Sequence, residues 1–223
     1  KEYLILYNPK SGNGRSLSII NYLKNKFKEV NFNYQIISSN YPGHMVELCQ
    51  SNIKYKKIII IGGDGTFNEA LNGIMLNPER KKQVFGFLPG GTGNSFMHDL
   101  GGQNYLDAIE LIITGKFKMI DVLKLQFNDS IKYSMNIVGW GLVSDINIMS
   151  EKLRFLGFMR YNIASLYYIF NKKNRYATIE IDGVKRKDEF LFILCSNTIH
   201  TGKGMKAAPH AKLDDGLLDV IIV

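Results

Sequence analysis

The sequence predicts an α/β fold in which a parallel-sheet domain precedes a β-rich domain. In the first half of the chain, short apolar segments alternate with helical patterns, and several of these segments run directly into glycine-rich loops. After Gly115 the pattern changes to pairs of strands. Alternating strands and helices are typical of a parallel sheet with helices on both faces. We therefore expect an α/β domain over residues 1–116 and a β-rich, sandwich-like domain over residues 117–223.

The first half contains four strand-like segments and five helical ones. The expected strands are residues 3–7, 34–38, 57–61 and 84–88. The expected helices are residues 17–27, 45–49 (as the beginning of a helix), 66–76, 95–100 and 105–113.

In the second half we expect two strand pairs on either side of a helical insert. Residues 119–127 pair with 131–137, and residues 176–181 pair with 190–195 around Asp182-Gly183, a dipeptide that favours tight hairpin turns. The insert covers residues 148–170 with a break at Gly157. Its apolar residues recur at helical spacing, as in a core helix or the wall of an acyl-chain pocket. The chain ends on a strand pattern, so we expect a truncated C-terminal domain.

Composition narrows the class of protein. The 223 residues are 45% hydrophobic, enough for a core, which excludes a disordered chain, a collagen-like repeat and a coiled coil. No apolar run approaches the ~18 residues of a membrane span. Two cysteines cannot build a disulfide framework and indicate a reducing compartment. The net charge of +8 allows nucleic acid, an anionic membrane or phosphorylated ligands as partners.

Three glycine-rich segments follow predicted strands. Asn8–Arg15 follows the first strand, Gly62–Glu69 the third and Leu88–Ser95 the fourth. Glycine at such positions lets backbone N–H groups face an anion beside a helix N-terminus. For the first segment the alternative is a plain loop without a ligand. For the second it is a helix cap, with Asp64 or Thr66 capping and Glu69 closing a capping box. Open α/β sheets bind ligands at the edge where such loops meet, which favours a phosphate site.

Taken in order, these motifs resemble the diacylglycerol kinase catalytic family, which includes diacylglycerol, sphingoid-base and ceramide kinases. The motifs are Asn-Pro-Lys-Ser-Gly from Asn8, Gly-Gly-Asp-Gly-Thr-Phe-Asn-Glu from Gly62 and Pro-Gly-Gly-Thr-Gly-Asn-Ser-Phe from Pro89. The segment Trp140–Gly157 is similar to the sphingoid branch. The resemblance implies a phosphofructokinase-like nucleotide fold, ATP and Mg²⁺ as cofactors, and transfer of the γ-phosphate to a lipid hydroxyl.

The resemblance also implies roles for particular residues. The nucleotide-binding residues would be Asn8, Pro9, Lys10, Ser11, Gly12, Ser39, Gly63, Asp64, Gly65, Thr66, Phe67, Asn68, Glu69 and Thr92. Asp64 and Asp121 would be catalytic, although Asp121 also suits a plain strand end. Asp145 would bind the lipid head group; in the alternative, Ser144 or Asp145 only begins a helix. A Mg²⁺ ion would bind at Lys212, Asp215 and Leu217, where a metal-free turn is an equally good interpretation.

The family's Asp-Gly-Glu element, whose Asp is the proposed general base, lies beyond the end of this sequence. Either that element is missing, or Asp64 handles the proton alone. We expect a cytoplasmic lipid kinase that associates peripherally with membranes, does not bind nucleic acid and could form a homodimer. The alternatives are an NAD kinase, because the Gly-Gly-Asp-Gly-Thr element is shared with that family, and a catalytically silent lipid-binding module.

Overall fold

The computed structural model describes residues 2–223, apart from the side chains of Arg154, Phe158 and Lys203. Contacts group the chain into two compact units. The first unit runs to Asn136 and includes Asn197–Leu217; the second comprises Ile137–Ser196 and Leu218–Val223. This grouping reflects contacts and not independent folding, so the boundary expected near Lys116 stays a prediction.

A parallel sheet of four strands forms the centre of the first unit, as the sequence predicts. Across the sheet the order is β2 (Asn33–Ser38), β1 (Glu2–Tyr7), β3 (Lys57–Gly62) and β4 (Val84–Pro89). Ile58–Ile61 of β3 are all buried, which is the continuous apolar pattern of a strand covered on both faces. Because all neighbouring strands pair in parallel, their carboxyl ends meet at one edge of the sheet.

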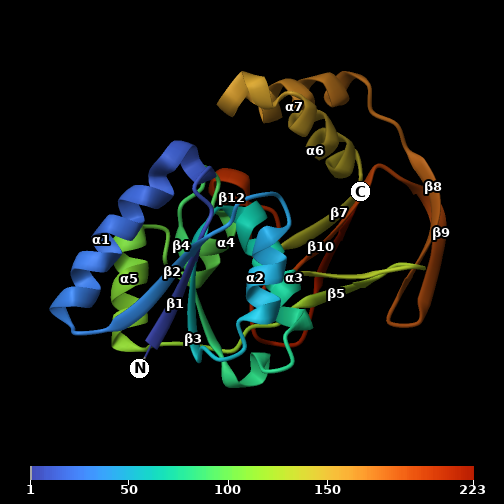
Figure 1. Ribbon diagram of the computed structural model, residues 1–223. Helices are drawn as coiled ribbons and strands as arrows, with labels where there is room; N and C mark the ends of the chain where they lie inside the picture. The colour runs from blue at the N-terminus through green and yellow to red at the C-terminus, as the bar shows by residue number, and fades with distance from the viewer. Residues whose placement is uncertain (1) are drawn as a thin grey trace. The chain divides into compact units, whose positions relative to one another are not determined.

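Helices cover both faces of this sheet (Figure 1). They are α1 (Arg15–Glu29), α2 (His44–Ser51), α3 (Asp64–Leu76), α4 (Ser95–Leu100) and α5 (Tyr105–Thr114). α1 and α5 lie side by side, and the rings of Tyr22 and Tyr105 meet edge to face at 5.8 Å. α2 and α3 cover the other face (Figure 1).

α1 shows why these segments form helices and where they pack. Its buried apolar residues are Ile19, Ile20, Leu23 and Phe27, which follow the spacing of one helical face. Phe27 contacts Tyr3 of β1, with 4.9 Å between the ring centroids. This stripe fastens α1 to the sheet and fixes the position of the loop that precedes the helix.

The first unit also contains two short antiparallel pairs. β5 (Leu123–Gln126) and β6 (Ile131–Ser134) form the hairpin that the sequence predicts, although both strands are shorter than expected. β11 (His200–Thr201) pairs with β12 (Met205–Lys206). Asp99 of α4 holds this second pair, because its nearly buried carboxylate accepts hydrogen bonds from Ile199 N at 2.8 Å and from His200 N at 3.2 Å.

The second unit combines a three-stranded antiparallel sheet, a hairpin and a pair of helices. The sheet order is β13 (Asp219–Ile222), β10 (Phe192–Ser196) and β7 (Ile137–Gly141). The hairpin is β8 (Arg175–Ile181) with β9 (Val184–Phe190). The helices are α6 (Leu142–Lys152) and α7 (Arg160–Phe170), joined by the 3₁₀ segment Arg154–Met159. These elements confirm the β-rich character expected after the parallel sheet.

The partner expected for strand 176–181 was wrong. Asp182 and Gly183 have φ of 48° and 83°, as a two-residue hairpin turn requires, and Val184 therefore pairs directly with Ile181. Most residues of β9 are charged or exposed, so the strand carries no apolar alternation that a sequence reading could detect. The apolar segment expected as the partner forms β10 and pairs with β7 and β13.

The helical insert breaks at Gly157, as expected, where φ is 57°. Its first helix begins at Leu142, six residues earlier than predicted. Within the described residues we find no helix with the length and apolar character needed to cross a membrane.

Candidate nucleotide and substrate site

The loop after β1 is tied to the loop after β3 by Asn8. Its Nδ2 donates to Thr66 Oγ1 at 3.2 Å, and its backbone N–H donates to Ile61 O at 3.1 Å. Its Oδ1 accepts a hydrogen bond from Lys10 N at 3.0 Å, which folds the loop back on itself. Asn8 therefore fixes both the shape and the position of this loop.

Glycine residues let the three loops touch through their backbones. A Cβ on Gly12 would lie 2.2 Å from Gly90 O, and one on Gly91 would lie 2.4 Å from Gly63 Cα. Gly62 O accepts hydrogen bonds from the backbone N–H groups of Gly90 at 2.7 Å and Gly91 at 3.1 Å. Any larger residue at these positions would push the loops apart, so the convergence inferred from the sequence is real.

Gly65 differs from these glycines because no neighbouring atom in the structure requires a glycine at this position. It lies in the first turn of α3, and a Cβ placed on it would meet nothing within 4 Å. Glycine costs a helix about 1 kcal/mol relative to alanine. The N-terminus of α3 also has no side-chain cap on its N–H groups. Open space and uncapped N–H groups at a helix N-terminus fit a phosphate group.

Asp64 is the first residue of α3, and Gly63 is the N-cap residue. The alternative in which Asp64 or Thr66 caps the helix is therefore wrong, because the Asp64 carboxylate accepts from Phe96 N at 3.3 Å and Thr66 Oγ1 accepts from Asn8. A Cβ on Gly93 would lie 3.0 Å from Asp64 Oδ2. Asp64 thus joins the second loop to the third.

Asp64 also lines a cavity of about 170 Å³. The other lining residues are Phe67, Asn68, Phe96, Ser134, Met135 and Asn136. Ser134 and Asn136 belong to no motif, so sequence reasoning missed them. Ser134 ends β6 and Asn136 follows it, and β6 is held to α3 by two 3.0 Å hydrogen bonds between Asn72 and the Tyr133 backbone. The cavity places polar groups beside the proposed catalytic carboxylate.

The other predicted nucleotide residues differ in exposure. Thr92 is exposed at the tip of the third loop, and Ser39 is nearly buried, its N–H bonded to Tyr7 O at 2.8 Å. Phe67 is buried and packs edge-on against Phe87 at 5.0 Å, which gives it a packing role in the core.

Asp121 is joined to the turn that contains the predicted metal residues. Its backbone N–H donates to Leu213 O at 2.6 Å, and its Oδ2 accepts from Gly216 N at 2.7 Å. Within the same turn, Asp215 Oδ1 accepts from Leu217 N at 3.1 Å. The structure therefore brings Asp121 together with the 212–217 turn, and the interactions it assigns to Asp121 do not include Asp64.

Asp145 lies in the first turn of α6, in the second unit. Arg175 Nη2 donates to both of its carboxylate oxygens, at 2.9 and 2.7 Å. The Arg175 guanidinium also lies 5.9 Å from the centre of the Trp140 ring. Gly141 is the N-cap of α6, so Asp145 does not start the helix, and its carboxylate is already paired with a cation.

A parallel sheet with glycine loops converging at its carboxyl edge is the architecture of a nucleotide-binding α/β enzyme. Residues 2–125 match the family described as the diacylglycerol kinase catalytic domain. Residues 136–223 match the YegS C-terminal NAD kinase beta sandwich-like domain. The chain belongs to the diacylglycerol kinase catalytic domain family, and it is a lipid kinase.

Individual relatives agree with this assignment. A diacylglycerol kinase from Staphylococcus carnosus is 30% identical over 228 residues, which cover 100% of this chain and 72% of that protein. Sphingosine kinase 1 from Arabidopsis thaliana is 25% identical over 279 residues, covering 100% of this chain and 56% of that protein. The crystal structure of a diacylglycerol kinase from Bacillus anthracis superposes with a TM-score of 0.75 at 28% identity, covering 100% of this chain and 73% of that one.

Proposed function

We propose that this protein transfers the γ-phosphoryl group of ATP to the hydroxyl group of a neutral membrane lipid of the diacylglycerol type. The observation that carries the proposal is the uncapped N-terminus of α3, where Gly65 faces open space beside two other glycine loops. Bound ATP supplies the phosphoryl group, and Mg²⁺ offsets the charge of its phosphates. Phosphoryl transfer depends mainly on positioning and charge neutralisation, which suits a site built from backbone N–H groups.

We assign one of two roles to Asp64: its carboxylate takes the proton of the acceptor hydroxyl group, or it binds the metal. Its carboxylate lines the cavity together with Asn68 and Asn136, so a hydroxyl group in that cavity would lie beside it. Asp121 is retained as a second candidate for the catalytic role, although its hydrogen bond to Gly216 gives it a structural one.

The pairing of Asp145 supports a neutral head group over a sphingoid base. If Asp145 lies at the lipid head group, as the family resemblance implies, a protonated amine would have to share the carboxylate with a cation that already contacts both of its oxygens. A hydroxyl or ester can instead accept from the guanidinium without displacing it. Sphingosine and ceramide are tested beside diacylglycerol in the assay that follows.

The test is a radiolabelled-ATP assay on diacylglycerol, ceramide, sphingosine and NAD, with Asp64→Asn beside wild type. Asparagine keeps the shape of Asp64 and can still accept from Phe96 N, so the fold should survive. We expect turnover of diacylglycerol, and a loss of at least about a hundredfold in kcat for Asp64→Asn. Asp129→Asn, in the exposed turn of the β5–β6 hairpin, is the matched control and should retain wild-type activity.

Retention of more than a tenth of wild-type activity by Asp64→Asn would overturn the role of Asp64. Phosphorylation of NAD and of none of the lipids would show that the proposed substrate class is wrong.

Mg²⁺ at the 212–217 turn is a separate proposal. No group of three or more His, Cys, Asp or Glu side chains within the described part of the chain is arranged to hold a metal. A site made of backbone carbonyls and one carboxylate does not need such a group. If Mg²⁺ binds there, it should raise the melting temperature of wild type but not of Asp215→Ala; an equal response of both would exclude this site.

A further inference from the structure

Two of the four histidines of the chain lie side by side, although they are far apart in the sequence. His98 belongs to α4 and His200 to β11, two elements of the first unit that contact each other. The centroids of the two rings are 5.3 Å apart, and the ring planes are inclined by 35°. Both residues are partly exposed, so ions in solution can reach the rings.

A carboxylate fixes the orientation of the His200 ring. The Asp99 side chain is only 4% exposed, and its Oδ2 lies 3.1 Å from His200 Nδ1. Because a carboxylate only accepts hydrogen bonds, Nδ1 carries the proton, and Nε2 of the neutral ring keeps its lone pair. Metal-binding histidines show this arrangement, in which a carboxylate holds one ring nitrogen and the other nitrogen binds the ion. The His200 ring is therefore prepared to act as a ligand through Nε2.

Gly204 lets the loop after β11 approach the His98 ring. Its φ is 78°, a conformation that favours glycine, and a Cβ on it would lie only 3.0 Å from His98 Cε1. Within the described residues, no hydrogen bond is assigned to either nitrogen of the His98 ring. The second imidazole is therefore held beside the first with its nitrogens available.

The separation of the rings matches that of two histidines on one metal ion. Zn–N bonds are about 2.0–2.1 Å long, so two imidazole rings that bind one ion at a tetrahedral angle have their centres about 5.2 Å apart. Imidazole nitrogen suits Zn²⁺, Cu²⁺ and Ni²⁺, whereas Mg²⁺ prefers oxygen ligands. We propose that His98 and His200 form a binding site for a divalent transition-metal ion such as Zn²⁺.

The protein supplies two ligands to this site. Asp99 is not a third, because its oxygens already accept from two backbone N–H groups and contact His200 Nδ1. Water would fill the remaining positions of a four-coordinate ion. Structural zinc sites have four protein ligands, so we expect an exchangeable ion that binds more weakly than a structural one.

A bound ion would join α4 to β11. Phe96, on the same helix, donates its backbone N–H to Asp64 at 3.3 Å. The ion would therefore restrain the helix that contacts the proposed catalytic carboxylate. The inference goes beyond the proposed function and does not rest on it, because an ion can bind here whether or not the protein phosphorylates a lipid.

The test is a calorimetric titration of the protein, without a histidine tag, with Zn²⁺ in a large excess of Mg²⁺. We expect one Zn²⁺ per chain. His98→Gln and His200→Gln should each weaken binding by about tenfold or more, because each removes one of two protein ligands. Asp99→Asn should weaken binding by about ten- to a hundredfold, because asparagine can still accept from Ile199 N but no longer fixes the proton on His200 Nδ1.

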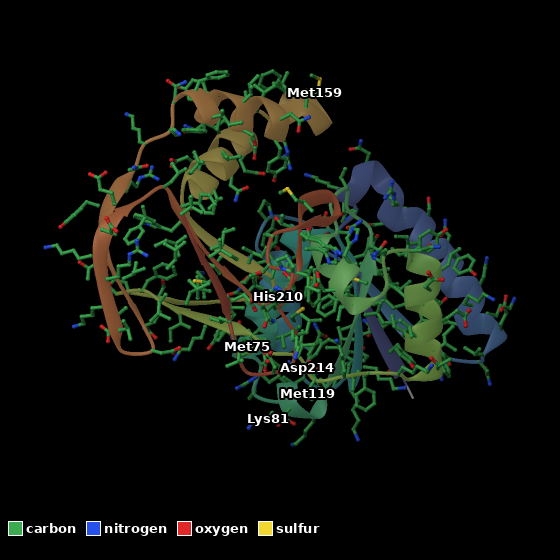
Figure 2. The ribbon with its side chains drawn as sticks, turned by 180° about the vertical axis from the view of Figure 1, so that it is seen from behind. Met75, Lys81, Met119, Met159, His210 and Asp214 are labelled. Carbon is green, nitrogen blue, oxygen red and sulfur yellow. The ribbon has the colours of Figure 1, made fainter. Side chains whose placement is uncertain are left out.

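The other two histidines provide matched controls. His44 Nδ1 accepts from Asn40 N at 3.1 Å, and Figure 2 shows His210 in the exposed segment that leads to Asp214. His44→Gln and His210→Gln should bind Zn²⁺ as wild type does. Melting temperatures measured in EDTA show whether each variant is folded.

Electron paramagnetic resonance of bound Cu²⁺ counts the nitrogen ligands without relying on a variant. We expect two imidazole nitrogens in wild type and one in His98→Gln or His200→Gln. A wild-type spectrum without two imidazole nitrogens would overturn the proposal.

Three results of the zinc titration would also overturn the proposal. The first is wild-type affinity in both His98→Gln and His200→Gln. The second is an equal loss in the two control variants, which would indicate adventitious binding by exposed histidines. The third is loss of Zn²⁺ binding in excess Mg²⁺, which would place the ion at an oxygen site. None of these measurements needs turnover, so failure of the kinase activity and failure of the metal site are distinguishable.

Discussion

Arg175 and Asp145, thirty residues apart in the sequence, form an ion pair in which one guanidinium nitrogen donates to both carboxylate oxygens. The side chains are 38% and 24% exposed, so the pair is partly shielded from water. The carboxylate that the family resemblance assigns to the lipid head group is therefore neutralised by the protein's own cation. This relationship determines what Asp145 can recognise.

Removing Arg175 should change lipid preference. In Arg175→Met, Asp145 keeps its charge and loses its partner, so a protonated sphingoid amine gains a charged hydrogen bond of roughly 1.5–3 kcal/mol. We expect the kcat/KM ratio of sphingosine to diacylglycerol to rise about ten- to a hundredfold at fixed ATP.

The control for this prediction is Arg186→Met, which breaks the exposed Arg186–Asp188 pair at 3.0 Å on β9. It should leave the ratio unchanged. The double variant Arg175→Met/Asp145→Asn should return the ratio toward wild type. An unchanged ratio in Arg175→Met would mean that Asp145 does not contact the head group.

Two glycines of α3 should respond oppositely to alanine. In Gly65→Ala the new methyl group enters open space, so the helix gains up to about 1 kcal/mol, while nucleotide binding loses the room it needs. We expect a melting temperature higher by about 2–4 °C and a markedly larger KM for ATP. Thermal unfolding and ATP titration measure the two effects separately.

Gly73→Ala is the contrasting variant, because its Cβ would lie 2.2 Å from Val46 O in α2. Overpacking of this kind costs about 1–3 kcal/mol, while the KM for ATP should stay near wild type. Unaltered ATP affinity in Gly65→Ala would show that no ligand occupies the space beside α3.

Asp121 should tolerate asparagine better than alanine. Asparagine Oδ1 can still accept from Gly216 N, whereas alanine leaves that N–H without its partner and costs about 1–3 kcal/mol. We expect Asp121→Asn to keep most of the wild-type turnover, and Asp121→Ala to lower the free energy of unfolding in urea. An inactive Asp121→Asn with wild-type stability would instead make Asp121 catalytic.

The buried thiol of Cys49 should resist alkylation. Burial raises its pKa to about 12, and burial also raises the pKa of Cys195. The folded pKa of Cys49 lies above the value of ~8.5 for a free thiol. The contribution of the protonated Cys49 thiol to folding stability is therefore fully present below about pH 8.5 and is lost as the pH rises toward 12.

At pH 8 we expect the native protein to react slowly with a thiol reagent, Cys195 before Cys49, and both to react fast in urea. Mass spectrometry of the labelled peptides distinguishes the two residues. Fast native labelling of Cys49 would contradict its burial.

The sequence alone was enough to predict the α/β half and its three loops. The parallel strands there are short apolar runs, three of the four are followed by a glycine-rich segment, and these signals are local. Gly65 could be recognised as part of the motif, but the sequence could not show why a glycine is there. Only the folded chain shows that a Cβ on Gly12 would strike Gly90, whereas one on Gly65 would meet nothing within 4 Å.

The features that only the tertiary structure decided are contacts between residues that are distant in the chain. Asp121 binds Gly216, ninety-five residues away, and Arg175 pairs with Asp145, so neither carboxylate has the environment that its own neighbours suggest. The charged strand Val184–Phe190 is also set by pairing, because a two-residue turn places it opposite β8 whatever its hydrophobicity. Local patterns report backbone preference and burial. The partner of a carboxylate or of a strand depends on which distant segments the fold brings together, and that information lies in the packing.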